Sequence, residues 1–191
     1  MIQFPGRLVL VVGSSGVGKD SVMDGARARL AGNSGFVFQR RVITRAAMPD
    51  AEDHDTLSIA AFEAARAKGD FSLSWQAHGL WYGVPREIED KMATGRTVIV
   101  NTSRTVIAAA RTLYPGTQTI HITASSETLV KRLSARGRET ADDIAARLAR
   151  NIAPVSPGEG VWRIENDGDL SDAVSRFIEI VELFASGNNL S

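Results

Sequence analysis

The sequence of 191 residues contains no cysteine. This absence excludes disulfides, zinc–thiolate centres and thiol catalysis, and it fits a reducing compartment. Basic and acidic residues number 22 each, so net charge gives no argument for nucleic acid or an anionic membrane as a partner. Apolar runs long enough to span a bilayer are also missing, as is the basic and apolar pattern of a signal peptide. We therefore expect a cytoplasmic protein with no membrane or nucleic-acid partner.

Strand-like and helix-like segments alternate along the chain. Such alternation is typical of an α/β domain whose parallel sheet is covered by helices on both faces. The expected strands are 8–12, 36–38, 71–77, 80–82, 97–100, 117–123 and 161–165, and the expected helices are 21–30, 59–68, 85–93, 105–113, 125–136, 141–152 and 170–184. With 43% hydrophobic residues, the chain is long enough for one packed domain.

We expect this single domain to cover residues 1–185 and to end in a frayed tail, 186–191. The segment 58–82 interrupts the regular alternation, so it is predicted to be a small insert that carries an acceptor site. The core would then comprise residues 1–57 and 83–185. Within the core, the basic segment 132–150 is expected to form a helical lid.

Residues 7–21 hold the most specific motif, an apolar strand followed by a glycine-rich turn and a lysine that opens a helix. Gly13, Gly18 and Lys19 have the spacing G-x-x-x-x-G-K of a phosphate-binding loop, or P-loop. Glycines let backbone N–H groups converge on phosphate oxygens, while the lysine and the helix N-terminus supply positive charge. The motif predicts that the chain binds a nucleoside triphosphate. The expected contacts are Gly13, Ser14, Ser15, Gly16, Val17, Gly18, Lys19, Asp20 and Ser21.

The position after the lysine departs from the motif. A serine or threonine whose hydroxyl binds Mg²⁺ is usual there, whereas this sequence has Asp20. Because a carboxylate is a strong ligand for Mg²⁺, Asp20 is a candidate metal ligand, either directly or through water. Alternatively, its charge only stabilises the N-terminus of the helix. The sequence leaves these two roles open.

Arginines are concentrated in the expected lid. Arg132 and Arg136 are four residues apart on a predicted helix and share a face, and Arg147 lies on the next helix. Phosphoryl transfer to an ionised phosphate needs charge neutralisation and in-line placement rather than a strong base. We therefore expect these three arginines to contact the transferred or the acceptor phosphate and to act with Lys19 in catalysis. The alternative is a solvated basic face paired with acidic neighbours.

A second group of side chains is predicted to bind the acceptor. Arg41 and Arg45 can clamp a phosphate, and Tyr82 can donate its hydroxyl to the same phosphate. Trp75 and Trp81, in contrast, are expected to be mainly structural, because aromatic residues are more often core residues.

The carboxyl end of a central strand offers further acceptor contacts. Asn101, Ser103 and Arg104 lie where parallel sheets place ligands, and they combine neutral hydrogen-bonding groups with one cation. His78 is a candidate partner for a ribose hydroxyl. The alternative is a purely structural role, in which it stabilises its own loop. Asn166 and Asp167 follow the last strand, where they lie either near adenine or in a plain turn.

Four landmarks resemble the guanylate-kinase branch of the nucleoside-monophosphate kinases. They are the P-loop, the string Arg-Val-Ile-Thr-Arg at 41–45, residues 69–71 with 78–83, and residues 132–139. Two departures concern the carboxylates with which that branch binds guanine. Leu73 stands in place of a glutamate, and Asn-Thr-Ser-Arg at 101–104 replaces an aspartate-rich turn. Each unpaired guanine donor costs about 1–3 kcal/mol, so GMP is a poor acceptor candidate.

The pattern is similar to the ribose 1,5-bisphosphate phosphokinases of phosphonate catabolism. The shared strings are Gly-Lys-Asp-Ser at 18–21, residues 41–45, 75–80, 101–104 and 136–139. This resemblance implies that ATP, with Mg²⁺, phosphorylates the 1-phosphate of ribose 1,5-bisphosphate to give 5-phosphoribosyl 1-diphosphate (PRPP). It also makes Asp20 a family trait.

Two alternative functions are a guanylate or other nucleotide kinase and a non-catalytic guanylate-kinase-like interaction module. Such modules lose the lysine of the P-loop and the arginines of the lid, and both are present here. The expected partners are therefore small molecules, a sugar phosphate and ATP. The oligomeric state is left open, with a homodimer among the options.

Overall fold

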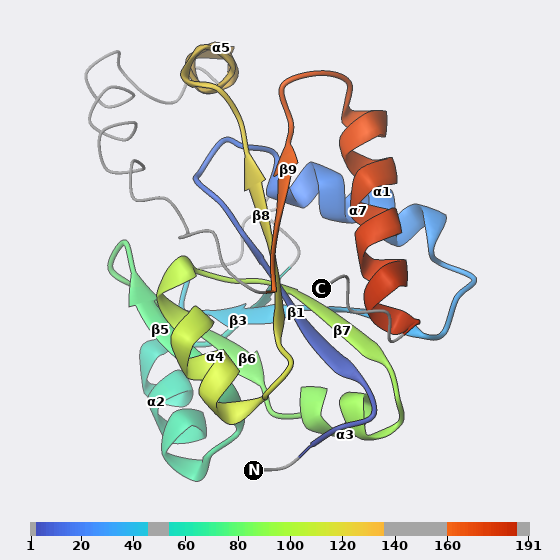
Figure 1. Ribbon diagram of the computed structural model, residues 1–191. Coiled ribbons are helices and arrows are strands. Elements are labelled where there is room, and N and C mark those ends of the chain that lie inside the picture. The colour runs from blue at the N-terminus through green and yellow to red at the C-terminus, as the bar shows by residue number, and fades with distance from the viewer. Residues whose placement is uncertain (1–2, 46–53, 136–159, 187–191) are drawn as a thin grey trace.

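The computed structural model describes residues 3–45, 54–135 and 160–186 (Figure 1). Five parallel strands form a central sheet in the order β2-β7-β1-β8-β9. Their bounds are β1 Arg7–Val12, β2 Phe36–Gln39, β7 Thr97–Asn101, β8 Gln118–Thr123 and β9 Val161–Glu165. This arrangement confirms the predicted α/β fold class, in which a parallel sheet forms the core.

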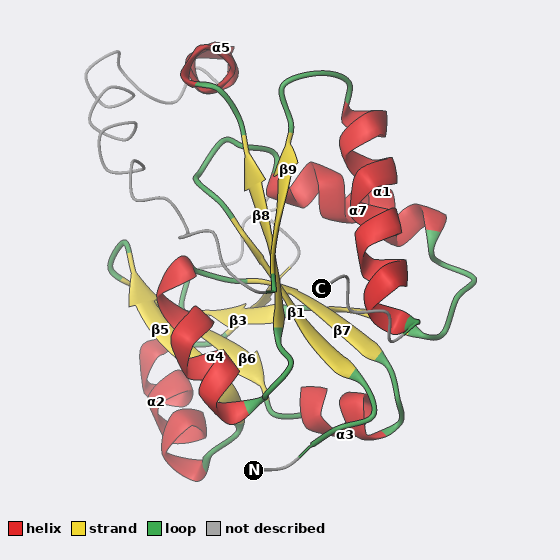
Figure 2. Ribbon diagram, viewed as in Figure 1, coloured by secondary structure: helices red, strands yellow, loops and turns green. Residues whose placement is uncertain are grey.

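Helices cover both faces of this sheet (Figure 2). Helices α1 and α7 pack on one face, and α3 and α4 pack on the other. The bounds are α1 Lys19–Arg29, α2 Ile59–Lys68, α3 Ile88–Ala93, a 3₁₀ turn η1 Arg104–Val106, α4 Ile107–Leu113, α5 Ser126–Ala135 and α7 Leu170–Ala185. In the part of the chain described, no helix combines the length and the apolar character needed to cross a membrane.

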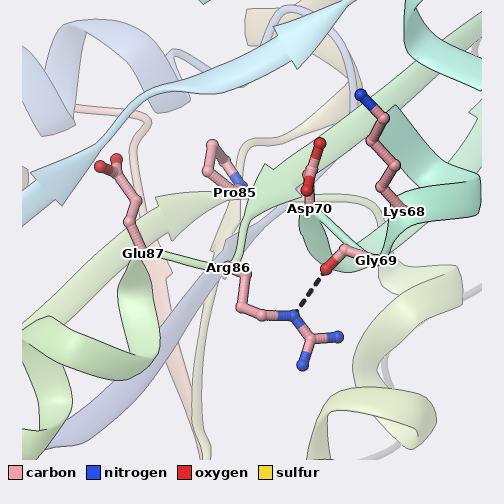
Figure 3. A pocket seen from close by; sticks show the side chains of 6 residues that line it. All are labelled: Lys68, Gly69, Asp70, Pro85, Arg86 and Glu87. Atoms are coloured by element: carbon pink, nitrogen blue, oxygen red, sulfur yellow. Dashed lines mark hydrogen bonds between the residues drawn. The ribbon is translucent and has the colours of Figure 1, made fainter. Parts of the chain in front are cut away.

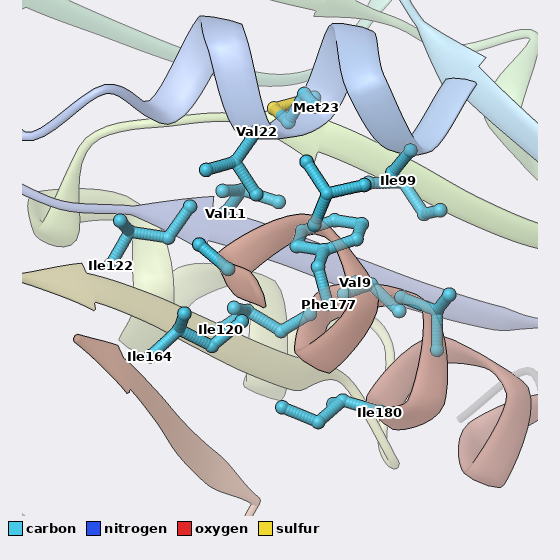
Figure 4. Packing of buried hydrophobic residues seen from close by; sticks show 14 of the residues in the cluster. Val9, Val11, Val22, Met23, Ile99, Ile120, Ile122, Ile164, Phe177 and Ile180 are labelled. Carbon is cyan, nitrogen blue, oxygen red and sulfur yellow. The ribbon is translucent and has the colours of Figure 1, made fainter. Parts of the chain in front are cut away.

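Strand β1 shows why the sequence folds in this way. All five residues from Leu8 to Val12 are buried, because side chains alternate between two faces that are both covered. Val9 and Val11 belong to the cluster with α1 and α7, in which Phe177 is fully buried (Figure 4). Leu8, Leu10 and Val12 belong to the cluster on the other face. The continuous apolar run therefore reflects burial on two sides.

A second sheet has the strand order β4-β3-β6-β5. Its strands are β3 Arg41–Ile43, β4 His54–Thr56, β5 Phe71–Ala77 and β6 Leu80–Pro85. Strand β6 pairs antiparallel with both β3 and β5, and β3 pairs parallel with β4. This sheet extends beyond the expected insert, 58–82, at both ends. Strands of three residues in a polar stretch are too short to show a hydrophobic period, which is why β3 and β4 were not predicted.

The prediction that a helix starts at Pro85 was wrong. Pro85 is the last residue of β6 and pairs with Phe71, and α3 begins at Ile88. The rule that proline favours the first turn of a helix holds only where no strand partner competes. The expected helix 141–152 and most of the expected lid lie outside the described residues, as do residues 187–191 of the expected tail.

Candidate active site

The P-loop connects β1 to α1 and has a conformation that requires glycine. Gly18 adopts φ 86° immediately before α1, and a Cβ there would lie 2.5 Å from the side-chain nitrogen of Asn166. The ammonium nitrogen of Lys19 lies 2.8 Å from the carbonyl oxygen of Gly13 and 3.1 Å from that of Ser14, and it donates to both. The lysine is thus held over the loop, as phosphate binding requires.

A cleft of about 470 Å³ opens between the P-loop, the second sheet and the carboxyl end of β7. It brings together nearly all the residues that were expected to bind ATP or the acceptor. The expected residues that line it are Gly13, Ser14, Ser15, Gly16, Gly18, Lys19, Asp20, Ser21, Arg41, Arg45, His78, Tyr82, Asn101, Ser103 and Arg104. Val17 is the exception within the loop, because its side chain is buried in the core.

Asp20 connects the two sides of this cleft. Its Oδ1 accepts a hydrogen bond of 2.7 Å from the amide nitrogen of Asn101, at the end of β7. The backbone oxygen of Asn101 in turn accepts from the Arg41 guanidinium at 3.4 Å. A chain of contacts therefore runs from the first turn of α1 to the second sheet. Asp20 is also the only carboxylate among the described residues that line the cleft, which contains four cations.

Three residues that line the cleft carry a buried polar atom without a hydrogen-bond partner among the described residues. Arg45 Nε, Asn101 Oδ1 and Thr102 Oγ1 are buried and form no hydrogen bond within the described part of the chain. Buried polar groups are nearly always paired in folded proteins, so these atoms mark places beside the cleft where a bound water or a polar ligand can complete the hydrogen bonds. Thr102 is a lining residue that the sequence analysis did not single out.

The arginines of the expected lid are only partly described. Arg132 lies on α5 and donates to the carbonyl oxygen of Val17 at 3.3 Å, and it is not among the residues that line the cleft. Arg136 and Arg147 lie outside the described residues. The structure therefore places one of the three arginines, beside the P-loop rather than within the cleft.

Asn166 is neither in a plain turn nor in the cleft. It is 2% exposed, and its amide nitrogen donates to the carbonyl oxygen of Val17 at 2.7 Å. Its own backbone nitrogen donates to the carbonyl oxygen of Thr123. This buried asparagine thus ties the end of β9 to the P-loop. A sequence separation of 149 residues between the two partners hides such a contact from local pattern analysis.

The sequence analysis also missed His121, a half-buried residue of β8. Burial is the main cause that lowers the pKa of His121, and the positive charges of Arg104, Arg163 and Lys19 lower it further. These cations include two residues of the cleft, so the imidazole is kept neutral near the phosphate-binding machinery. An uncharged histidine adds no further charge to a site already rich in cations.

This lowered pKa predicts how stability depends on pH. Below a pH of about 6.5 the unfolded chain protonates His121, whereas the folded protein resists protonation, so the free energy of unfolding falls as the pH drops. We expect that His121→Gln reduces the loss of stability between about pH 7 and about pH 5.5. Urea denaturation at both pH values measures the free energy of unfolding of each variant. The control is His78→Asn, a substitution at an exposed histidine. An unchanged pH dependence in His121→Gln would contradict this assignment.

A second, shallow pocket belongs to the fold rather than to the cleft. It lies where α2 meets the end of β6 and shares no residue with the cleft (Figure 3). Arg86 Nε donates to the carbonyl oxygen of Gly69 at 2.6 Å, and the backbone nitrogen of Arg86 donates to that of Asp70. These bonds fasten the C-terminus of α2 to the second sheet, which accounts for the residues gathered here.

Comparison with known proteins finds relatives over nearly the whole chain. A ribose 1,5-bisphosphate phosphokinase of Brucella melitensis biotype 2 is 46% identical over 173 residues, which are 91% of this chain and 90% of that protein. One from Chelativorans sp. strain BNC1 is 42% identical over 186 residues, covering 97% of this chain and 89% of that protein. No model of a protein family matches the sequence.

Solved structures support the fold independently. The crystal structure of guanylate kinase from Anaplasma phagocytophilum matches with a TM-score of 0.69 over 100% of this chain and 90% of that one. At 18% identity this likeness concerns the fold alone, and it confirms the predicted P-loop kinase architecture. The curated relatives match nearly the whole of both chains at a much higher identity, 46% and 42%. The chain therefore belongs to the family of ribose 1,5-bisphosphate phosphokinases.

Proposed function

We propose that this protein transfers the γ-phosphoryl group of ATP to the 1-phosphate of ribose 1,5-bisphosphate, which gives PRPP, and that it serves phosphonate degradation. The observation that carries the proposal is the charge of the cleft. Lys19 of the P-loop faces the same cavity as Arg41, Arg45 and Arg104. Asp20, the one carboxylate that lines it among the residues described, is engaged by Asn101. Such a cavity favours two anionic molecules side by side.

The chemistry follows from this charge distribution. An oxygen of the acceptor's 1-phosphate, already ionised near neutral pH, forms a bond to the γ-phosphorus while the bond to the β-phosphate oxygen breaks and ADP leaves. No strong base is needed, so catalysis consists of positioning and charge neutralisation. In this proposal Lys19 neutralises the transferred group, and Arg41 and Arg45 hold the acceptor.

The expected lid completes the proposal. We assign Arg132, Arg136 and Arg147 to the transferred or the acceptor phosphate, with the solvated basic face as the alternative. Arg132 contacts the P-loop through the carbonyl oxygen of Val17, so its guanidinium lies beside the loop that would hold the phosphates of ATP.

The same cleft offers little to a guanine base. Leu73, in place of the glutamate, is 4% exposed and packs in the core. Ser103 and Arg104 follow β7 where carboxylates would be needed. Unpaired guanine donors would each cost about 1–3 kcal/mol, whereas sugar hydroxyls can pair with neutral polar side chains such as those of Asn101 and Ser103, which line the cleft. The cleft therefore supports a sugar phosphate over GMP.

Two related sugars test the proposed acceptor. We expect that ATP and ribose 1,5-bisphosphate give PRPP, identified by the diphosphate signals in ³¹P NMR. Ribose 5-phosphate, which lacks the 1-phosphate, should release no ADP above the background of ATP alone. Transfer to the free hydroxyl of ribose 5-phosphate, or no transfer to the bisphosphate, would overturn the proposal.

Mg²⁺ is the metal that we propose to accompany ATP, since it neutralises phosphate charge. Bound with a nucleotide, it needs only one or two protein carboxylates besides the phosphates. The carboxylate of Asp20 next to Lys19 fits this need with oxygen ligands, although one of its oxygens already accepts from Asn101. No group of three or more metal-binding side chains was found among the residues described.

We expect that Asp20→Asn raises the Mg²⁺ concentration for half-maximal activity about tenfold, because the amide lacks the charge that attracts the cation. Asp24→Asn is the matched control, since Asp24 lies on the same helix but pairs with Arg27 at the surface. Magnesium titrations of the rate at fixed free ATP measure the effect. If both variants required the same Mg²⁺ concentration, Asp20 would not be a metal ligand, and its charge would only stabilise the N-terminus of α1.

A further inference from the structure

We propose that Trp75 determines acceptor specificity by keeping nucleobases out of the acceptor site. This inference rests on the proposed function, because it concerns which phosphate-bearing molecules the same cleft accepts. The sequence analysis treated Trp75 as a structural residue. In the folded protein, however, it lines the cleft and is only 7% exposed, so its indole forms part of the wall.

The rings of Trp75 and Tyr82 form a stacked pair. Their centroids are 5.3 Å apart and their planes differ by 7°, and the two residues face one another in the register of β5 and β6. The Arg41 guanidinium lies 5.4 Å from the centre of the same tyrosine ring and comes from β3, on the other side of β6. Tyr82 is therefore contacted from both neighbouring strands by side chains of the protein itself.

This arrangement removes the usual means of binding a base. A nucleobase is held by stacking on an aromatic face and by hydrogen bonds to its edge. Here the indole occupies the stacking position beside Tyr82. Leu73, two residues before Trp75 on the same face of β5, offers no hydrogen bond. A phosphorylated sugar needs neither feature, since cations and hydroxyl partners suffice to bind it.

Trp81, on the neighbouring strand β6, has different surroundings from Trp75. This residue stacks on Phe62 at 5.9 Å and lies under the Arg66 guanidinium at 4.5 Å, and it is not among the residues that line the cleft. Trp75 and Trp81 thus lie on neighbouring strands of one sheet, but only Trp75 faces the cleft. The two tryptophans form a matched pair for an experiment.

The test measures binding of GMP and AMP by calorimetry, with β,γ-methylene-ATP present at saturation to fill the donor site. We expect that Trp75→Ala binds these nucleotides about tenfold more tightly than the natural protein, the size of one base–aromatic stacking interaction. Trp75→Phe, which keeps a stacking ring, and Trp81→Ala should both bind them as weakly as the natural protein. If Trp75→Ala does not fold, Trp75→Leu, which keeps an apolar side chain in the core, should show the same gain.

The result that would overturn the inference is a folded Trp75→Ala or Trp75→Leu protein whose affinity for both nucleotides stays within twofold of the natural one. Equal gains in Trp75→Ala and Trp81→Ala would also overturn it. Failure of the proposed function looks different. In that case the natural protein does not convert ribose 1,5-bisphosphate, whereas the calorimetric comparison between variants still gives its answer.

Discussion

Replacement of Lys19 by methionine is expected to lower kcat by about 10³-fold, the largest effect of any single substitution in the cleft. The ammonium group is held over the P-loop by the carbonyl oxygens of Gly13 and Ser14. From this position it can neutralise the negative charge that develops on the transferred phosphoryl group. Methionine keeps an unbranched chain of similar length but removes the charge, so packing in the loop should be little disturbed.

Single-turnover measurement of phosphoryl transfer isolates the effect on chemistry. Lys68→Met is the control, because Lys68 is an exposed residue of α2 that does not line the cleft. Its rate should match that of the natural protein. A Lys19→Met variant that transfers phosphate at the natural rate would show that the loop does not bind the γ-phosphate.

Arg45→Ala should raise the KM for the acceptor by roughly 10- to 100-fold, while the KM for ATP stays nearly constant. Arg45 lines the cleft, and its Nε is buried without a hydrogen-bond partner in the described structure. A phosphate oxygen would supply that partner through a charge-assisted hydrogen bond. Arg45→Lys should restore little of the affinity for the acceptor, because lysine lacks the planar fork of donors that matches a phosphate.

Arg40→Ala serves as the comparison for Arg45. Arg40 donates to the carbonyl oxygen of His54 and pairs with Asp55 at 3.3 Å, and it does not line the cleft. Steady-state kinetics with each substrate varied in turn separates the two roles. If Arg45→Ala raised the KM for ATP and left the KM for the acceptor unchanged, Arg45 would bind ATP rather than the acceptor.

The sequence predicts best those elements whose ends carry a local signal. Helix α2 covers Ile59–Lys68 as expected, because the Ser58 hydroxyl accepts from the backbone nitrogen of Ala61 and Gly69 ends the helix at φ 80°. Strand β5 and strand β9 also match their expected bounds. The P-loop is predictable for the same reason, since its glycines and lysine are adjacent in the chain.

Contacts between distant segments could not be predicted. The bond between Asp20 and Asn101 joins residues 81 positions apart, and the stack of Trp75 on Tyr82 depends on the register of a hairpin. Nothing local distinguishes Trp75 from Trp81, because both are aromatic residues in short strands. The strands β3 and β4 are formed by three-residue segments whose pairing is decided by the surrounding sheet.

The most direct measurement offers both acceptors at once. Equal concentrations of ribose 1,5-bisphosphate and GMP are incubated with limiting ATP and Mg²⁺, and the products are followed by ³¹P NMR. A cationic cleft whose acceptor side has no site for a purine predicts that the sugar receives the phosphoryl group and that PRPP accumulates while GMP persists. Accumulation of GDP with the sugar unchanged would contradict this account.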